Sequence, residues 1–372
     1  MGMGSVYFFC FPHGPADRAG YEHEIICLAE GLRLLNIQYS GNIDYWMEGN
    51  SPGDFLIRHD PSISYQEADI VVFSSVIYNY ESTHLLPQDL FSPNRLYRLV
   101  FIDASDDLWT PGFRDEMRSC DMVLKCHYNR KYPLPDNFRP WAFGISSRIL
   151  DQLAVNPASS TDGISPRKAE ILVNYRFVPS LRERAMKEIL PLFDDVLKEN
   201  RTTDSYDPYE LSDKDRLYWA QSGRRHYPSY YRRLLDCEAC SCFGGNLEKW
   251  TTHREGKFWN VVRKVDGKLS LFRDDRVYQF DSWRFWESFA AGTCVFHVNL
   301  EKYGCVLPVM PVNMVHYLGF DLEKPMRIVN MIHDDPALLR TIGNAGKSWV
   351  FDNYSPKAVA ERFLELAASS PI

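Results

Sequence analysis

The chain has 372 residues, 45% of them hydrophobic, a length that suits two domains of ordinary size. Acidic residues outnumber basic ones, with 49 Asp and Glu against 42 Lys and Arg, which argues against a nucleic-acid-binding protein. No segment approaches the ~20 consecutive apolar residues of a transmembrane helix, and residues 1–22 lack the basic start of a signal peptide. We therefore expect a soluble, cytoplasmic protein without a transmembrane segment.

Nine cysteines are scattered along the chain, and without a secretion signal we expect reduced thiols. Cys237, Cys240 and Cys242 form a C-x-x-C-x-C string, a spacing that suggests a zinc site. No second Cys or His cluster with ligand spacing follows it, and the string lies in a run typical of a strand. We therefore interpret these cysteines as small buried residues and expect no metal.

The first half of the chain alternates strands with helices. An aromatic-rich apolar run at 5–11 ends at Pro and Gly, which is typical of a buried strand. Residues 22–35 repeat apolar side chains at helical spacing, and further apolar runs at 68–75, 98–105 and 120–127 predict three more buried strands. Continuously apolar strands separated by helices form parallel sheets covered on both faces, so the sequence predicts an α/β fold.

A segment rich in Ser, Pro, Asn and Gly at 154–168 is the best linker candidate. Behind it the alternation restarts with a strand at 169–175, a helix at 180–199, a strand at 238–245, and a helix followed by a strand in 281–299. We therefore expect two Rossmann-like domains with parallel sheets flanked by helices. Ligands bind beyond the carboxyl ends of such strands, so we expect the site in a cleft between the domains.

The C-terminal part of the sequence predicts a short strand at 325–332 and two helices after it. Asp335 and Ser355 each precede a Pro, the pattern of an N-cap followed by Pro at the first helical position. We expect four parts: an N-terminal domain (1–153), a linker (154–168), a C-terminal domain (169–354), and a last helix (355–372) that packs back on the N-terminal domain.

The loop after strand 169–175 carries Arg176, and the helix behind it carries Arg182 and Arg184. A guanidinium at the carboxyl end of a strand, beside a helix N-terminus, suits a diphosphate, because the free N–H groups and the helix dipole add to its charge. The alternative is a solvated helix face on which Arg182 and Arg184 pair with Glu183 and Glu188.

A second candidate loop, after strand 238–243, is the pair Gly244 and Gly245. Adjacent glycines allow close approach of the backbone to a ligand, or form a tight turn. The preceding segment 201–236 is rich in Tyr and Arg and lacks a simple period. Its aromatic rings could stack on a sugar or a base, or the segment could be a partly exposed helical insertion.

The third candidate loop opens the stretch "DSWRFWESFAAGTCVFHVN" at 281–299. Ser282 is placed to cap a helix, and Gly292 to end it before a strand. Arg284 and Glu287 are three residues apart and share a helix face. A carboxylate there could accept both hydroxyls of a ribose while the helix N-terminus faces phosphate. The alternative is a plain Arg284–Glu287 pair on the surface.

The stretch "FDSWRFWESFAAGTCVF" resembles the donor-binding segment of glycosyltransferases of the GT-B fold, in which a Glu precedes small residues, a Gly and a Val-rich strand. The following "LEKPMRIVNMIHDDPALLRTIGNAGKSWVFDNYSPKAVAERFLEL" is similar to their ending, with a strand, a D-P helix, a G-x-x-G turn, a Trp, Y-S-P and a final helix. The resemblance covers about the last third of the chain; the first half agrees in organisation more than in motif.

This resemblance implies that the C-terminal domain binds a nucleotide-diphosphate sugar and that the N-terminal domain binds the acceptor, a saccharide, a lipid-linked or a small molecule. Glu287 would bind the donor ribose. Arg176, with Arg182, would hold the diphosphate and stabilise the charge of the leaving nucleotide, without a metal or a cofactor besides the donor. Gly244 and Gly245 would belong to the same donor site.

The stretch is also similar to exostosin-like members of the group, which makes Ser282 and Arg284 further donor-site candidates. Many retaining members carry two glutamates eight positions apart. Here the earlier position is Gln279, and Asp281 is out of register. The resemblance therefore leaves open whether the sugar is transferred with retention or inversion.

The N-terminal stretch "PHGPADRAGYEHE" places a Gly-rich loop after the first strand, where such enzymes approach the acceptor or the donor phosphate. His13, Gly20 and His23 are the candidates there, with a capping or packing role as the alternative for His23. An inverting enzyme needs a general base near the acceptor hydroxyl. Asp103 is favoured because it ends a strand; the other candidates for the base are Asp106, Asp107, His13 and His127.

Two other functions are compatible with the sequence. Asp103, Asp106 and Asp107 could bind a divalent metal with a nucleotide sugar, although the usual D-x-D spacing is absent. The chain could also be a GT-B-like module that binds a sugar nucleotide or a protein without turnover. The metal-dependent alternative leaves the C-terminal resemblance unexplained.

Overall fold

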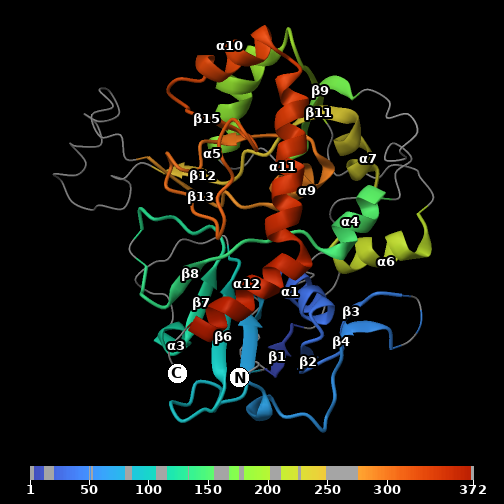
Figure 1. Cartoon of the computed structure of the whole chain (residues 1–372), viewed down its shortest axis with the longest axis vertical. Helices are drawn as coiled ribbons and strands as arrows, with labels where there is room; N and C mark the ends of the chain where they lie inside the picture. The colour runs from blue at the N-terminus through green and yellow to red at the C-terminus, as the bar shows by residue number, and fades with distance from the viewer. Residues whose placement is uncertain are drawn as a thin grey trace, which may run out of the picture.

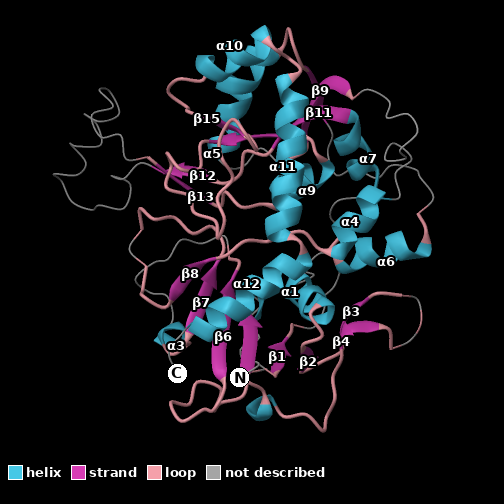
Figure 2. Ribbon diagram, in the orientation of Figure 1, coloured by secondary structure: helices cyan, strands magenta, loops and turns pink. Residues whose placement is uncertain are grey.

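The computed structural model of the chain (Figure 1) contains two parallel sheets, one above the other along its long axis. Figure 2 shows helices around both of them. The structure describes residues 4–11, 21–49, 51, 53–79, 86–105, 115–132, 134–154, 167–175, 180–201, 211–224, 228–248 and 275–369. Most of the predicted linker 154–168 therefore lies outside the described residues.

The N-terminal sheet has six strands in the order β2-β1-β5-β6-β7-β8, and every neighbouring pair is parallel. The predicted buried strands at 5–11, 68–75, 98–105 and 120–127 are confirmed as β1, β5, β6 and β7. The strands are β1 (Ser5–Phe9), β2 (Gln38–Gly41), β5 (Ile70–Ser74), β6 (Arg98–Asp103), β7 (Met122–Lys125) and β8 (Phe138–Pro140).

The C-terminal sheet has five parallel strands in the order β10-β9-β11-β14-β15. Two antiparallel ribbons accompany the sheets, β3 (Tyr45–Met47) with β4 (Phe55–Ile57) and β12 (Asn246–Glu248) with β13 (Arg276–Tyr278). The five strands of the sheet are β9 (Lys168–Val173), β10 (Lys198–Arg201), β11 (Cys237–Ser241), β14 (Cys294–Val298) and β15 (Leu318–Phe320).

The helices that matter for the site are α7, α9 and α4, which lie beside one another, and α12, which lies along α1 (Figure 1). None of the described helices combines the length and the apolar composition needed to cross a membrane. The helices are α1 (His23–Leu34), α2 (Val76–Asn79), α3 (Asp115–Arg118), α4 (Ser147–Ala154), α5 (Ser180–Arg184), α6 (Asp213–Gln221), α7 (Pro228–Asp236), α9 (Trp283–Ala291), α10 (Met326–Asp334), α11 (Leu338–Tyr354) and α12 (Pro356–Ser369).

The carboxyl ends of the two sheets face each other. The loop that leaves β7 meets the loop that leaves β14: Val306 N–H donates to the carbonyl of Tyr128, and Arg130 N–H donates to that of Gly304, both at 2.9 Å. The side-chain amide of Asn129 donates to the carbonyls of Val277 and Tyr303 at 2.9 Å each. Loops at these two ends therefore lie next to each other, which is where α/β sheets bind ligands.

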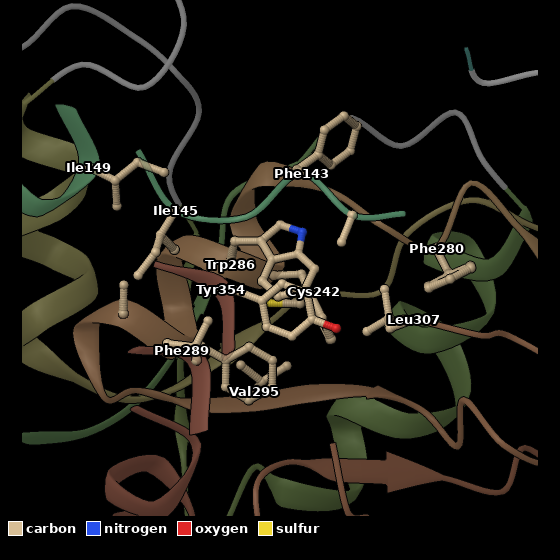
Figure 3. Packing of buried hydrophobic residues seen from close by; sticks show 14 of the residues in the cluster. Phe143, Ile145, Ile149, Cys242, Phe280, Trp286, Phe289, Val295, Leu307 and Tyr354 are labelled. Carbon is tan, nitrogen blue, oxygen red and sulfur yellow. The ribbon is translucent and has the colours of Figure 1, made fainter. Parts of the chain in front are cut away.

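One hydrophobic core runs through both halves of the chain. At its centre Trp286 of α9 packs beside Tyr354 at the end of α11, with ring centroids 4.5 Å apart. Phe143 and Ile145, from the segment that crosses between the sheets, lie over this pair (Figure 3). The helix that carries the candidate donor residues is thus fixed by packing from both halves.

The predicted strand at 325–332 is wrong, because this segment forms α10. Its buried residues are Ile328, Val329 and Ile332, whose spacing of one and four places them on one face of a helix. Pro325 stands at the N-cap position, and its fixed φ suits the start of a helix. A short apolar run does not by itself separate a buried strand from an amphipathic helix.

The predicted G-x-x-G turn is also wrong, since Gly343 and Gly346 lie inside α11. A Cβ on Gly343 would stand 2.4 Å from the carbonyl oxygen of Gly292, and one on Gly346 would stand 2.4 Å from that of His316. The glycines therefore allow α11 to pack closely against two backbone segments. Close packing between a helix and a loop gives the same sequence pattern as a turn.

The predicted helix at 180–199 is shorter than expected. The regular helix α5 ends at Arg184, and a π-helical turn (Ala185–Ile189) and a 3-10 turn (Leu190–Phe193) follow. Pro191 lacks the N–H that would continue the helix, and its ring excludes the usual position of the carbonyl four residues earlier. Residues 194–197 form a turn, and the last two residues of the predicted helix belong to strand β10.

Candidate functional site

The C-terminal sheet has its topological switch point between β9 and β11, because the chain continues from β9 to β10 on one side and to β11 on the other. Tyr175 lies two residues after the end of β9, and Ser241 ends β11. Their hydroxyl groups are hydrogen-bonded at 3.0 Å. Burial raises the pKa of Tyr175 to about 12, so the phenol keeps its proton at neutral pH. This pair marks the centre of the expected ligand-binding edge.

Two arginines converge on the ring of Tyr175. The guanidinium carbon of Arg182 lies 5.3 Å from the ring centroid, and that of Arg284 lies 5.8 Å from it. Arg182 also donates from Nε to the carbonyl of Phe243 at 3.1 Å. Arg182 comes from α5 and Arg284 from the first turn of α9, so the fold brings together two predicted site residues that are 102 positions apart in the sequence. Both cations are held by the aromatic ring they share.

The arginines of α5 divide between the two alternatives that the sequence left open. Arg184 follows the surface alternative, since its Nε donates to Glu188 at 2.8 Å. Glu183 pairs with Lys187 instead of an arginine. Arg182 points to Tyr175 and is not part of this exposed face. Arg176, the strongest candidate for the diphosphate, lies outside the described residues.

The glycine pair after β11 packs against backbone. A Cβ on Gly244 would stand 2.9 Å from the carbonyl oxygen of Gln279, and one on Gly245 would stand 1.7 Å from that of Tyr278. Gly245 also has φ of +74°, which favours glycine. The glycines therefore let the end of β11 lie directly on the segment that leads into α9, and this accounts for them without a ligand.

The helix and the strand predicted in 281–299 are confirmed as α9 and β14. Ser282 stands at the N-cap with extended φ and ψ, but its hydroxyl makes no capping hydrogen bond. Gly292 ends the helix in the left-handed conformation with φ of +72°, as predicted. The positive end of the α9 dipole lies beside Arg284, in the first turn.

Glu287 is completely buried, on the side of α9 that faces α7 and α4. Its Oε1 accepts a hydrogen bond from the hydroxyl of Tyr231 at 2.8 Å and lies 3.8 Å from a guanidinium nitrogen of Arg148. The alternative of a surface pair between Arg284 and Glu287 is therefore wrong. A carboxylate taken out of water needs such partners, because an uncompensated buried charge is costly.

His23 is the first residue of α1 and is buried. Its Nε2 lies 3.1 Å from the carbonyl oxygen of Gly144, so it carries the proton and donates. Its Nδ1 therefore accepts from the hydroxyl of Tyr21 at 2.8 Å. These contacts fit the packing alternative for His23, and a catalytic role stays a prediction. His13 and Gly20 lie outside the described residues.

Asp103 ends β6, as predicted, and both of its carboxylate oxygens have partners. Oδ2 forms an ion pair with Lys125 Nζ at 2.8 Å, and both groups are almost completely buried. Oδ1 accepts from the backbone N–H and the hydroxyl of Ser105. The structure thus gives Asp103 a local role at the end of β6. Its role as a general base stays a prediction. Asp106 and Asp107 lie outside the described residues.

Another candidate base, His127, lies where the two halves meet. Its Nδ1 accepts from the backbone N–H of Asp281 at 3.1 Å. Asp281 accepts in turn from the indole N–H of Trp286 and from the backbone N–H of Phe143. Burial raises the pKa of Asp281 to about 8. Asp281 is therefore a buried junction between the segment entering α9 and the N-terminal half.

Two further carboxyl groups at the start of α1 were not among the predicted site residues. Glu22 accepts from the backbone N–H of Phe11 and from the hydroxyl of Ser74, so it joins the ends of β1 and β5. Burial raises the pKa of Glu22 to about 7 and that of Glu24 to about 8. The only hint in the sequence is the position of these acids directly after the Gly-rich loop.

The three cysteines of the C-x-x-C-x-C string are buried as free thiols, as the residues around them predicted. Cys242 Sγ lies 3.3 Å from the hydroxyl of Ser288 on α9. Within the described part of the chain, no group of three or more His, Cys, Asp or Glu residues is arranged to hold a metal ion.

Comparisons with known proteins place this geometry in a fold. No family model matches the chain, and no curated protein matches it. Among solved structures, an alpha-glucosyltransferase in complex with UDP and a 13-mer DNA containing a central A:G mismatch is similar over 99% of this chain and 100% of that one, with a TM-score of 0.52 and 9% identity. The alpha-glucosyltransferase (AGT) in complex with UDP is similar over 98% and 100%, with a TM-score of 0.51 and 8% identity.

These likenesses cover both halves of the chain. At 8% to 9% identity they show the fold and nothing more specific. The chain has the GT-B fold: two Rossmann-like halves whose parallel sheets present their carboxyl ends to each other. The fold expected from the sequence is thereby confirmed.

Proposed function

We propose that this chain is a glycosyltransferase that moves a sugar from a nucleotide-diphosphate sugar to an acceptor hydroxyl. The observation that carries the proposal is the convergence of Arg182 and Arg284 on Tyr175, at the switch point of the C-terminal sheet. It is supported by the GT-B fold and by the resemblance of residues 280–296 to a donor-binding segment. Two guanidiniums at the carboxyl edge of a parallel sheet suit a diphosphate.

The two arginines would serve both binding and catalysis. When the bond between the sugar and the diphosphate breaks, negative charge grows on the leaving nucleotide. Guanidiniums that are already in place stabilise that charge without reorganisation, and they do so more strongly where water is excluded. The N-terminus of α9, beside Arg284, adds a positive dipole end. Arg176 would join them from the loop after β9.

Glu287 would accept the hydroxyls of the donor ribose. It follows Arg284 by one helical turn, so a nucleotide with its diphosphate at the start of α9 brings its ribose towards Glu287. Glu287 is completely buried. Side chains that cover it, those of α7 among them, would have to shift as the nucleotide enters.

The acceptor would bind on the N-terminal half, with its hydroxyl near the start of α1. A metal-dependent reaction at Asp103 is less well supported, because Lys125 already places a positive charge 2.8 Å from its carboxylate. The general base would come from the same half, where Asp103 pairs with Lys125 and His23 donates to the carbonyl of Gly144.

A nucleotide panel tests the proposal. The melting temperature of the whole chain is measured with UDP, GDP, ADP and dTDP and with their glucose conjugates, because a ligand that binds the folded state raises it. UDP is the first to try, as both similar structures contain it. We expect one nucleotide series to stabilise the wild type, and Arg284→Met to abolish the shift.

Arg340→Met is the matched control, since Arg340 is an exposed arginine paired with Glu238. It should keep the full shift. Hydrolysis or transfer of the selected sugar nucleotide is then measured with and without a chelator. If no nucleotide stabilises the chain, the proposal is wrong. If a nucleotide binds without turnover, the chain is a binding module, and activity lost on chelation would favour the metal-dependent alternative.

A further inference from the structure

A chain of buried side chains connects Glu287 to the N-terminal half. Arg148, on α4, stands in the middle of it. It donates from one terminal nitrogen to the hydroxyl of Tyr231 at 2.8 Å, and from Nε to the hydroxyl of Tyr21 at 3.4 Å. Tyr231 donates to Glu287, and Tyr21 donates to His23 at the start of α1. The chain therefore runs from α9 through α7 and α4 to α1.

Arg148, in the middle of this chain of side chains, determines the direction of every hydrogen bond in it. Arg148 can only donate, so both tyrosine hydroxyls accept from it and must pass their own proton outward. Burial raises the pKa of Tyr231 well above its usual value, which keeps that proton on the phenol. Glu287 therefore accepts the hydrogen bond from Tyr231. A ribose hydroxyl that donates would require the same accepting role of this carboxylate.

We propose that Arg148 and Tyr231 are positioning residues that orient the Glu287 carboxylate for recognition of the donor ribose. This inference rests on the proposed function. Tyr231 and Arg148 both lie on Oε1, so they fix the rotation of the carboxylate plane on α9. A carboxylate has about four lone-pair sites, and Tyr231 uses one of them. Recognition of a ribose hydroxyl depends on the orientation of the others.

In this arrangement the contact between Glu287 of the C-terminal half and the donor ribose depends on Arg148, which lies outside that half. Arg148 follows the crossing segment that carries Phe143 and Ile145, and it also binds Tyr21 ahead of α1. Lysine at this position would keep the charge but lose the planar fork that reaches both tyrosines at once. Arg148→Lys and Tyr231→Phe should therefore have the same consequence for Glu287.

Discrimination between ribonucleotides and deoxyribonucleotides tests the inference, because a merely structural role would not alter it. Dissociation constants are measured for UDP, GDP and ADP and for their 2′-deoxy forms. We expect the wild type to prefer one ribonucleotide by about 10- to 100-fold, as for a hydrogen bond to a charged group. Tyr231→Phe and Arg148→Lys should each reduce this ratio to about threefold or less, and their double variant should lose little more.

Tyr97→Phe is the control, since it removes a buried tyrosine hydroxyl that donates to the carbonyl of Leu90, in the other hydrophobic cluster of the N-terminal half. It should keep the wild-type ratio, and melting temperatures show whether each variant is folded. If the variants keep the ratio, or if Tyr231→Phe binds the ribonucleotide more tightly than the wild type, the inference is wrong while the proposed function stands. A wild type that binds no nucleotide overturns both.

Discussion

The two carboxyl edges that face each other are built from opposite chemistry. On the N-terminal side, the buried polar groups include Asp103 at the end of β6, paired with Lys125, and Glu22 and Glu24 at the start of α1. On the C-terminal side, α5 and the first turn of α9 present Arg182 and Arg284 around one tyrosine. A net charge of −7 conceals this division. In the proposed function, the basic edge would hold the diphosphate of the donor, and the acceptor hydroxyl would lie on the N-terminal side.

The two edges also differ in how burial acts on them. Burial raises the pKa of the carboxyl groups Glu22 and Glu24, so their charge depends on pH near neutrality. A guanidinium stays charged across that range. Changes of pH near neutrality should therefore alter the charge of these carboxyl groups and leave the guanidiniums of Arg182 and Arg284 charged. The following predictions test this difference between the edges.

The largest expected effect is on the free energy of unfolding and concerns the buried ion pair between Asp103 and Lys125. Asp103→Ala leaves the Lys125 ammonium buried without its partner, and we expect a loss of about 3–5 kcal/mol in the free energy of unfolding, measured with urea. The control is the double variant Asp103→Ala with Lys125→Met, which should recover most of the loss. Equal losses in both variants would show that the ion pair is not the cause.

Removing both cations of the basic edge should affect binding. For Arg182→Met with Arg284→Met we expect donor affinity to fall at least about 100-fold, or ~3 kcal/mol, since each loses a charge-assisted hydrogen bond to phosphate. Isothermal titration with the nucleotide selected by the panel measures it. Arg184→Met is a control from the same helix, because Arg184 pairs with Glu188 on the surface. A similar loss in the control would mean that net charge matters and position does not.

Substitution of Gly245, which follows β11, should destabilise the fold because backbone atoms of neighbouring residues lie against it. Gly245→Ala forces a left-handed φ and a collision with the carbonyl of Tyr278, whereas Gly53→Ala meets only the first problem. We expect Gly245→Ala to lower the free energy of unfolding by about 2 kcal/mol more than Gly53→Ala does. Denaturant midpoints of the two variants give the comparison. Equal midpoints would contradict the close approach of β11 to β13.

The smallest expected effect, counted per pH unit, is on the slope of the unfolding free energy against pH. Burial raises the pKa of Asp281 to about 8, above its usual 3.8, so the folded chain holds a proton that the unfolded chain releases. That contribution to stability is complete below pH ~4 and is lost as the pH rises to about 8. The unfolding free energy should therefore fall across this range. Asp281→Asn should make the slope shallower by up to ~1.4 kcal/mol per pH unit.

A matched substitution on the basic edge should not change that slope. Arg284→Met leaves every buried carboxyl group in place, and the guanidinium it removes does not titrate in the range measured. Unfolding free energies of the wild type, Asp281→Asn and Arg284→Met are measured at pH 5, 6, 7 and 8, and their slopes are compared. If Asp281→Asn keeps the wild-type slope, Asp281 is not protonated in the folded chain, and the pH dependence comes from other buried carboxyl groups, Glu22 and Glu24 among them.

The parts of the fold that the sequence predicted well are those with local causes. The helix in 281–299 has a polar start, an apolar face and Gly292 at its end, and all three act within one segment. Residues 325–332 were predicted as a strand because a short apolar run is compatible with either a buried strand or an amphipathic helix. The surrounding structure, which is not visible in the segment, selects the helix.

The candidate site shows the same limit. Arg182 could be proposed because it follows a strand, the position where ligands bind in parallel sheets, and Arg284 because its segment resembles a known donor-binding segment. Arg148 and Tyr231 could not, since their relation to Glu287 exists only after three helices have packed together. Burial is likewise a property of the folded chain, so the raised pKa of Glu24 has no counterpart in the sequence.

The contact of α12 with α1 has a consequence for the order of folding. A Cβ on Gly31 of α1 would stand only 1.9 Å from the carbonyl oxygen of Pro356, so α12 lies directly on the backbone of α1. Trp141 and Phe363 add an aromatic contact to the same junction. During synthesis the N-terminal sheet leaves the ribosome long before residues 356–369. The surface of α1 that α12 covers therefore stays without this partner until residues 356–369 have been made.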